Sequence, residues 1–273
     1  MRKFVALFLS CHFCFCCFSQ TAKQSLISPY IKTGAYSHNQ ADVFSFGTNQ
    51  ASLATASSFS AGVFSERKFM LSDLNLFSAA FALPTSSGNF GLQVHRFGNS
   101  AYNETQAGIA YARKLSDYID VGVQFNYYAM QIAGYGNAAA INFEAGAIFH
   151  FTDNLHGGVH VYNPTSTTIG KNEEERLPAV YSAGVGYDAS ESFFITAEIE
   201  KTENLPLSVN ASIQYKFSER FLARGGMVSG TSVYFFGAGF ILYNIRIDAT
   251  ASVHPQLGVT PGLLLIYTKP KKQ

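Results

Sequence analysis

The sequence has little charge and no tryptophan. Of its 273 residues only 14% are Asp, Glu, Lys or Arg, and the formal net charge is +1 at pH 7. Soluble domains carry about 25% charged residues, so this composition indicates a surface that is small or that faces something other than water. A net charge near zero also argues against the concentrated positive surface that nucleic acid phosphates require. We therefore expect no nucleic acid partner.

Cysteine is absent from most of the chain. The first 19 residues begin with an Arg-Lys pair and continue as an apolar run from Phe4 to Phe18. This pattern is typical of a secretory signal peptide, residues 1–19, cleaved between Ser19 and Gln20. A single membrane anchor and a lipoprotein leader are the alternatives. All four cysteines lie in this leader: Cys11, Cys14, Cys16 and Cys17. The mature chain is therefore predicted to contain no cysteine, which excludes disulfides, thiolate catalysis and cysteine-ligated metals.

Long apolar runs are missing as well. No stretch of 18 apolar residues follows the leader, which excludes a bundle of membrane-spanning helices. Apolar and polar residues instead alternate, as in residues 118–128, where Val121, Val123 and Phe125 are interleaved with Gly122 and Gln124. A period of two is typical of β-strands with two different faces. About fourteen such runs follow one another: 57–67, 72–83, 88–97, 103–114, 118–130, 138–151, 155–163, 178–188, 193–201, 207–217, 220–228, 232–240, 243–253 and 258–268.

The lengths of the runs and of their connections favour a membrane barrel. Most runs have the roughly 9 to 11 residues that a tilted strand needs to cross a bilayer. The turns after the fourth, sixth, eighth and tenth runs are short, whereas connections after odd runs are often longer, up to Asn163–Arg176. We predict an all-β fold: a single antiparallel, transmembrane up-and-down β-barrel of about 14 strands over residues 56–268, with a basic tail at 269–273. A soluble β-sandwich is the alternative.

The predicted barrel has a lipid face and a turn end. We expect the short turns to face the periplasm of a Gram-negative cell, with the barrel in the outer membrane. A charge placed at Val123 or Ile213 should cost about 2 to 4 kcal/mol near the midplane, and the same change at Gln124 or Gln214 should be mild. Aromatic residues beside the short turns are expected to form a girdle at one membrane interface: Tyr118, Phe151, Phe193, Phe194, Phe217 and Phe221.

Residues 20–55 do not alternate and are rich in Ser, Gln, Asn and Ala. A barrel of fourteen strands encloses more space than its own side chains fill, so this segment is predicted to fold inside as a plug. The alternative is a disordered periplasmic tail. If Asp42 and Asn49 anchor a plug against wall residues such as Arg246 or Gln124, the intact barrel should conduct ions poorly.

The same segment carries a resemblance to a known family. GAYSHNQADVFSFGTNQASLA resembles the leading segment of FadL-like barrels and of the PorV/PorQ group from Bacteroidota, where an acidic residue precedes an Asn-Pro-Ala signature. Asp42 and the residues Asn49, Gln50 and Ala51 occupy the matching positions, with Gln50 in place of the proline. The closing region, FFGAGFILYNIRIDATASVHPQLGVTPGLLLIY, is also similar to that group, although the residues TKPKKQ follow where many barrels end.

The resemblance implies two roles without catalysis. The first is an accessory partner in type IX protein secretion or surface assembly, with secretion translocon subunits or secreted proteins as partners beside outer-membrane lipid. The alternative is a FadL-like passive channel for hydrophobic small molecules. A protein partner should require exposed apolar residues on the extracellular loops, such as Phe69, Met70 and Tyr102, whereas a channel should require a lumen pocket and a wall opening.

Polar residues on the inner face are the remaining candidates for function. The lumen-facing candidates are Gln93, His95, Gln124, Asn126, Glu144, His150, His156, Glu198, Glu200, Gln214, Arg246 and Asp248. Inward charges in barrels are ordinarily solvated or paired across the lumen, and no hydrolase, zinc-protease or nucleotide motif occurs, so we expect no enzyme activity, cofactor or metal site. A hairpin centred on Asp153 pairs His150 with His156, either as two solvated histidines or as a pH-sensitive or weak metal pair.

Overall fold

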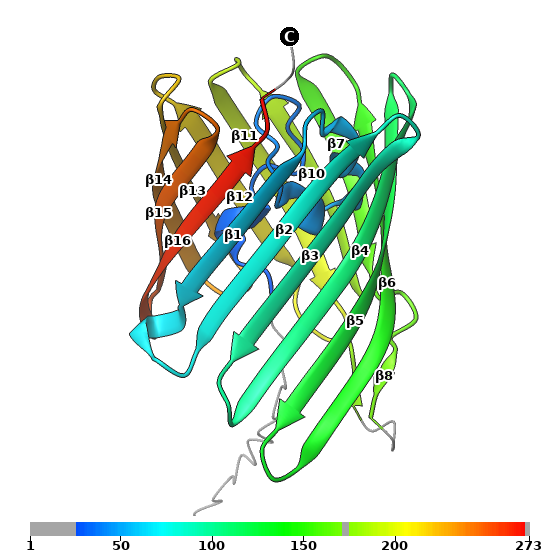
Figure 1. The fold of residues 1–273 in the computed structure, drawn as a ribbon, viewed down its shortest axis with the longest axis vertical. Helices are drawn as coiled ribbons and strands as arrows, with labels where there is room; N and C mark the ends of the chain where they lie inside the picture. The colour runs from blue at the N-terminus through cyan, green and yellow to red at the C-terminus, as the bar shows by residue number, and fades with distance from the viewer. Residues whose placement is uncertain (1–25, 171–174, 271–273) are drawn as a thin grey trace, which may run out of the picture.

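The computed structural model describes residues 26–170 and 175–270, so the predicted leader and cleavage site, residues 20–25 and the last three residues of the basic tail lie outside the described residues. Fourteen antiparallel strands form a closed barrel (Figure 1). They are β1 (Ser60–Arg67), β2 (Asn75–Thr85), β3 (Gly88–Gly98), β4 (Tyr102–Ser116), β5 (Ile119–Ile132), β6 (Gly136–His150), β7 (Leu155–Tyr162), β10 (Val180–Asp188), β11 (Phe193–Thr202), β12 (Ser208–Lys216), β13 (Phe221–Val228), β14 (Val233–Leu242), β15 (Ile245–His254) and β16 (Gly258–Thr268).

Every alternating run of the sequence overlaps with one of these strands, so the predicted barrel and its strand count are confirmed. Each strand pairs with its neighbours in the chain, except that β7 pairs with β10 and β1 closes the barrel against β16. The chain between β7 and β10 carries the two-residue strands β8 (Thr168–Ile169) and β9 (Glu175–Arg176), which pair with each other. Because the barrel is closed, its sheet has no unpaired edge strand.

The two faces of the wall differ in the way that the period of two predicts. In β5, Val123, Phe125 and Tyr127 are exposed on the outside, whereas Gln124 and Asn126 are buried inside. The same holds in β12, where Ile213 is exposed beside buried Ser212 and Gln214. An outer surface covered with large apolar side chains requires apolar surroundings, as a bilayer provides. Within the described residues, no helix is long and apolar enough to cross a membrane.

The barrel has two distinct ends. At the turn end, uppermost in Figure 1, residues 86–87, 117–118, 151–154, 189–192, 217–220 and 243–244 connect the strands, and β16 ends there beside the start of β1. At the loop end lie residues 68–74, 99–101, 133–135, 163–170, 175–179, 203–207, 229–232 and 255–257. The first of these loops contains the short 3₁₀ helix η4 (Lys68–Met70).

Aromatic side chains surround the turn end, with one correction to the predicted girdle. Tyr118, Phe151, Phe217 and Phe221 are exposed on the outside. Phe194 is fully buried and faces the lumen, because the alternation in β11 places it on the same face as the inward residues Thr196 and Glu198.

Residues 26–55, the inner segment, lie inside the barrel, where they are drawn in blue in Figure 1. They contain three 3₁₀ helices, η1 (Pro29–Lys32), η2 (Ser45–Gly47) and η3 (Gln50–Thr55). Their apolar side chains form one core with inward residues of the wall. This core contains Tyr30, Ile31, Val43, Phe44, Phe46 and Leu53 of the segment, and Phe64, Ala80, Ala82, Ala110, Ala112, Phe235, Leu264 and Ile266 of the wall.

Glycines of the wall make room for the inner segment. A Cβ atom added at Gly122 would lie 2.4 Å from the backbone carbon of Gln50, and one at Gly184 would lie 2.4 Å from the ring of Tyr36. Neither distance leaves space for a side chain, because real Cβ contacts of this kind begin above 3.0 Å. At these two glycines the inner segment therefore lies directly against the backbone of the wall, with no side chain between them.

Candidate ligand site in the barrel lumen

Asp42 joins the inner segment to the wall at the turn end. One carboxylate oxygen lies 3.0 Å from Arg224 Nη2 and 3.2 Å from Arg246 Nη1, and the other accepts a hydrogen bond from the Phe44 amide. Burial alone would raise the pKa of Asp42, but the two guanidinium groups offset it and hold the pKa below its ordinary value. Asp42 is therefore a buried anion between two cations. Arg246 is one of the two wall residues that were predicted from the sequence as contacts for the segment.

Tyr30 adds a second contact between η1 and the same part of the wall. Its hydroxyl donates to Asp248 at 2.8 Å, its carbonyl accepts from Arg224 Nη1 at 2.9 Å, and its ring stacks under that guanidinium at 5.1 Å. Asp248 in turn accepts from Arg246. The two arginines and two aspartates form one network in which each charge has an opposite partner.

The Asn49-Gln50-Ala51 triplet lies on the opposite side of the lumen. Asn49 caps η3, because its side-chain oxygen accepts from the Ala51 amide at 3.1 Å, and its amide nitrogen donates to the carbonyls of Ala147 and Val159. Gln50 donates to Glu144 at 2.6 Å. Asn49 thus anchors the inner segment to backbone carbonyls of β6 and β7.

The lumen-facing candidates from the sequence all point inward, but few of them are solvated. Gln93, His95, Gln124, Asn126, Gln214 and Asp248 are at most 1% exposed, Glu144, His156 and Glu198 are buried, and Glu200, His150 and Arg246 are partly buried. Glu144 accepts from Gln124, Asn126 and Gln50. Because these side chains are packed against the inner segment, a charge at Gln124 or Gln214 should be disruptive, and the expectation of a mild effect is revised.

At least three cavities remain around the inner segment among the described residues. Two of them, of about 110 Å³ and 590 Å³, lie toward the loop end and share Ile27, Lys32, Thr48 and Glu198 among their lining residues. The third, of about 600 Å³, lies at the turn end between the inner segment and residues such as Tyr243 and Lys269. The inner segment lines all three, so it stands between the space at one end of the barrel and the space at the other.

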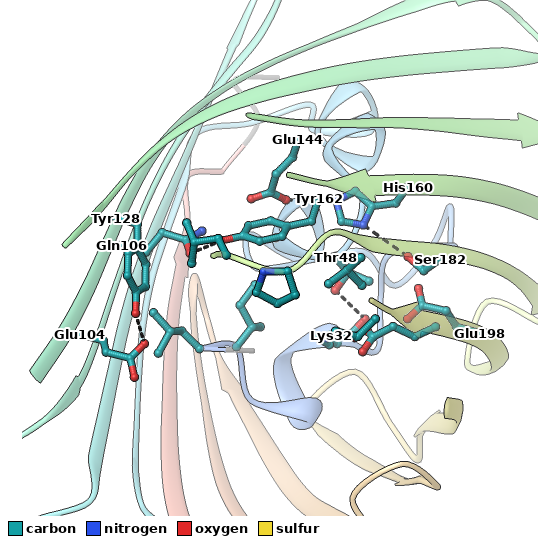
Figure 2. Close-up of a pocket in the computed structure, with 18 residues that line it drawn as sticks. Lys32, Thr48, Glu104, Gln106, Tyr128, Glu144, His160, Tyr162, Ser182 and Glu198 are labelled. Carbon is teal, nitrogen blue, oxygen red and sulfur yellow. Dashed lines mark hydrogen bonds and ion pairs between the residues drawn. The ribbon is translucent and has the colours of Figure 1, made fainter. Parts of the chain in front are cut away.

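The smaller loop-end cavity, which we call the loop-end site, has an acidic and phenolic wall on one side (Figure 2). Glu104 of β4 accepts hydrogen bonds from the hydroxyls of Tyr102 and Tyr128. Tyr162 of β7 donates to Gln106 at 3.4 Å, and its ring crosses the cavity beside Glu144 in the figure. These residues come from adjacent strands whose inward positions bring carboxylates and phenols together.

The other side of the loop-end site is formed by the inner segment and by β11. Lys32 Nζ forms an ion pair with Glu200 at 3.2 Å, and the Tyr36 hydroxyl donates to Glu198 at 2.7 Å. Burial alone would lower the pKa of Lys32, but Glu200 and Glu198 outweigh it, so the pKa lies above its ordinary value. Four carboxylates line the site, from Glu104, Glu144, Glu198 and Glu200, and the cationic side chain of Lys32 balances only part of their charge.

An apolar surface completes the loop-end site. Leu26 and Ile27 of the inner segment face it together with Leu177, Pro178 and Val180. Leu177 belongs to the long loop after β7 and is buried in a small core with Tyr128, Ala140 and Ile169, on which Leu26 packs. The site therefore offers one apolar side and one side rich in hydrogen-bond acceptors.

Several residues of the loop-end site were not among the candidates named from the sequence. Glu104 and Tyr128 lie on inward positions of alternating strands, which is a signal that could have selected them. Lys32, Leu26 and Leu177 belong to segments without alternation, and only the folded chain brings them to the site.

The histidine pair predicted from the hairpin lies at the turn end. His150 and His156 are paired in register, and their Nδ1 atoms are 2.9 Å apart. His160 lies elsewhere, with Nε2 at 3.1 Å from Glu144 in the loop-end site. Among residues 26–170 and 175–270, no group of three or more His, Cys, Asp or Glu side chains is placed to hold a metal ion.

The same architecture occurs in solved structures. The toluene transporter TodX of Pseudomonas putida aligns with 90% of this chain and 98% of its own, at a TM-score of 0.66 and 12% identity. The toluene transporter TbuX of Ralstonia pickettii aligns with 89% and 98%, at 0.63 and 12%. A Pseudomonas aeruginosa FadL homologue aligns with 86% and 94%, at 0.60 and 11%. The fold is FadL-like.

The comparisons agree with one part of the resemblance read from the sequence. The FadL-like barrel is found, and its structural neighbours include two toluene transporters and a FadL homologue. No family model matches the chain, and no curated protein matches it. At identities near 12%, the likeness is one of fold.

Proposed function

We propose that the protein is a passive, non-enzymatic outer-membrane channel for small molecules that are largely hydrophobic. The observation that carries this proposal is the loop-end site, a cavity with an apolar side, built from residues of the inner segment, the barrel wall and the loop after β7. The FadL-like fold supports it, because the solved neighbours include toluene transporters and a monoaromatic hydrocarbon channel.

The lining of the site narrows the chemistry of the proposed ligand. Leu26, Ile27 and Val180 can cover an apolar group, such as an aromatic ring, and burial of that group drives binding. Glu104 and Glu198 offer acceptor oxygens within the same cavity. A ligand with an apolar body and one hydrogen-bond donor, such as a phenol, matches both sides, whereas a carboxylate would meet four like charges.

We propose an orientation that follows from the two ends of the barrel. Short turns on the periplasmic side and longer loops outside are the rule in outer-membrane barrels. The loop-end site would then face the exterior and take up the ligand first. The turn-end cavity would lie on the periplasmic side, beyond the inner segment.

A pair of tryptophan variants tests this proposal. Val180→Trp places a large ring in the cavity, whereas the neighbouring Tyr181→Trp changes an outward, exposed position of the same strand. The measurement is uptake of a radiolabelled alkylphenol by Gram-negative cells that carry equal amounts of each variant in the outer membrane. We expect Val180→Trp to reduce uptake to the level of cells without the protein and Tyr181→Trp to leave it unchanged. Equal uptake by both variants would contradict the proposed route.

An accessory role in type IX secretion, in the style of the PorV/PorQ group, is the second candidate. The observation in its favour is a set of exposed apolar side chains on the loops, including Met70, Leu71, Tyr135 and Leu257. Of the loop residues named from the sequence, Phe69 is only partly exposed because its ring contacts His254, and Tyr102 begins β4. Co-purification of translocon subunits with the wild type, lost in a Met70→Asp, Leu71→Asp variant, would support this role. Purification of the barrel alone from native membranes would count against it.

A further inference from the structure

The turn-end cavity, of about 600 Å³, carries the opposite charge to the loop-end site. Its lining includes Lys216 of β12, Arg246 of β15 and Lys269, which follows β16. Asp42 is the one carboxylate among the described residues that line it. The lining of the loop-end site, by contrast, has four carboxylates and one lysine. The lumen is thus acidic toward the loops and basic toward the turns.

The carboxylate of Asp42 does not neutralise the lysines of the turn-end cavity. It lies between Arg224 and Arg246, at 3.0 Å and 3.2 Å. Arg246 pairs with Asp248 as well. Two arginines and two aspartates therefore balance one another, and the charges of the two lysines are left over.

Lys216 lies among like charges. It is partly buried, and the two guanidinium groups of this network repel its ammonium group. The carboxylates of Asp188 and Glu191 attract it from a distance, but neither forms an ion pair with it. Over the ranges that the structure describes, Lys269 has no ion pair either. An anion in the cavity would offset the repulsion between these cations.

An apolar surface adjoins the lysines. Val43 of the inner segment, Leu222 of β13 and Ile266 of β16 line the same cavity and are at most 5% exposed. Tyr243 and Lys269 also line it and are exposed, so the mouth of the cavity lies at the turn end. A ligand with an apolar body and one negative charge matches this combination of side chains.

We propose that the turn-end cavity binds small organic anions, with the charge held by Lys216 and Lys269 and the apolar body packed on Val43, Leu222 and Ile266. The identity of the anion rests on the proposed function. A phenol that occupies the acidic loop-end site as the neutral molecule would lose its proton to water and occupy the turn-end cavity as the phenolate, because nearby carboxylates disfavour an anion and nearby cations favour it. The substrate class thus narrows to weak acids with an apolar body.

Binding of para-nitrophenol to the purified full-length protein in a non-ionic detergent tests the proposal, because its phenolate absorbs visible light. We expect binding at a pH above the pKa of the free phenol, a lower pKa for the bound phenol, and weaker binding at high salt. Lys216→Gln should weaken binding about tenfold or more, and the further change Lys269→Gln should weaken it again.

Two controls separate charge recognition from other effects. Lys114→Gln changes an exposed lysine at the same end of the barrel and should leave phenolate binding unchanged. The neutral ether para-nitroanisole should bind alike to the wild type and to Lys216→Gln. Heat-modified migration in gels checks that each variant forms the barrel. Wild-type phenolate affinity in folded Lys216→Gln, or equal affinity of the wild type for the phenolate and the ether, would overturn the proposal.

Val180→Trp distinguishes a failure of this proposal from a failure of the proposed function. It alters the loop-end site and not the turn-end cavity, so the purified variant should bind the phenolate as the wild type does. Loss of uptake in Val180→Trp together with wild-type phenolate binding in Lys216→Gln would overturn the anion site alone. Normal uptake in Val180→Trp together with phenolate binding that requires Lys216 would support the anion site and contradict the proposed route.

Discussion

Asp42→Asn is the substitution that should weaken the docking of the inner segment most selectively. It removes the anion that Arg224 and Arg246 share, while it keeps the size of the side chain. The Arg224 side chain is 0% exposed and that of Arg246 is 12% exposed, so the lost charge leaves a buried cation without its partner. Removal of one member of a buried ion pair costs about 3 to 5 kcal/mol.

The remaining contacts place the expected effect at the lower end of that range. Arg224 retains Gln214 at 2.7 Å and the Tyr30 carbonyl at 2.9 Å, and Arg246 retains Asp248. We therefore expect docking to weaken by about 3 kcal/mol, which raises the population of the undocked segment about a hundredfold. The barrel itself should persist, because its ladder does not involve Asp42.

Trypsin measures this population at a single bond. Lys32 is the only lysine or arginine between residues 26 and 55, and it is held against Glu200, so cleavage after it requires the segment to leave the wall. We expect cleavage about a hundredfold faster in Asp42→Asn than in the wild type. Asp117→Asn removes an exposed ion pair with Lys114 and should have no effect. A wild-type rate in Asp42→Asn would refute the anchoring role of Asp42.

Acid should reproduce the effect of the substitution. The folded-state pKa of Asp42 is lowered, so its contribution to docking is fully present above the unfolded pKa, about 3.9. It is lost as the pH falls below that value toward the folded-state pKa. Hydrogen exchange of the inner segment, corrected for intrinsic rates, should differ between wild type and Asp42→Asn at pH 6, and the difference should shrink below about pH 4. A difference that grows in acid would contradict the sign of the shift.

Three further predictions concern the wall and its contacts. Ile213→Arg, on the lipid face, should cost about 2 to 4 kcal/mol in a folding titration in lipid vesicles, against about 0 to 1 kcal/mol for Phe217→Arg near the turn end; equal costs would contradict the assigned faces. Gly122→Val should expel η3 from the wall and expose Lys32 to trypsin, whereas Gly225→Ala, with its nearest contact at 3.4 Å, should not. Tyr36→Phe deletes a hydrogen bond to the Glu198 carboxylate, which should weaken docking by about 1.5 to 3 kcal/mol and raise the rate of the same tryptic cleavage by the corresponding factor. An unchanged rate would show that this bond does not hold the segment.

The wall was predictable from the sequence because lipid and lumen impose opposite demands on alternate residues. In β5 this separates Val123 and Phe125 from Gln124 and Asn126 without ambiguity. Where two adjacent residues are equally apolar, the signal fails. Phe193 and Phe194 follow each other, and only the register of β11 shows that Phe194 faces inward.

The interior was less predictable, because its contacts join parts of the chain that share no pattern. The inner segment folds as short 3₁₀ helices, and its fit depends on wall glycines such as Gly122, whose role appears only when the backbone of Gln50 lies against it. The loop-end site joins Lys32, Glu104 and Leu177 from three distant segments. No periodicity of the sequence relates such residues to one another.

Ion conductance in planar bilayers tests most directly the claim that the inner segment divides the lumen. The full-length barrel should conduct poorly, and deletion of residues 26–55, with the leader and its cleavage site kept, should raise the single-channel conductance. The shortened protein should still insert, because the fourteen strands supply every bond of the closed ladder. A deletion variant that inserts normally and conducts no more than the full-length protein would contradict this division of the lumen.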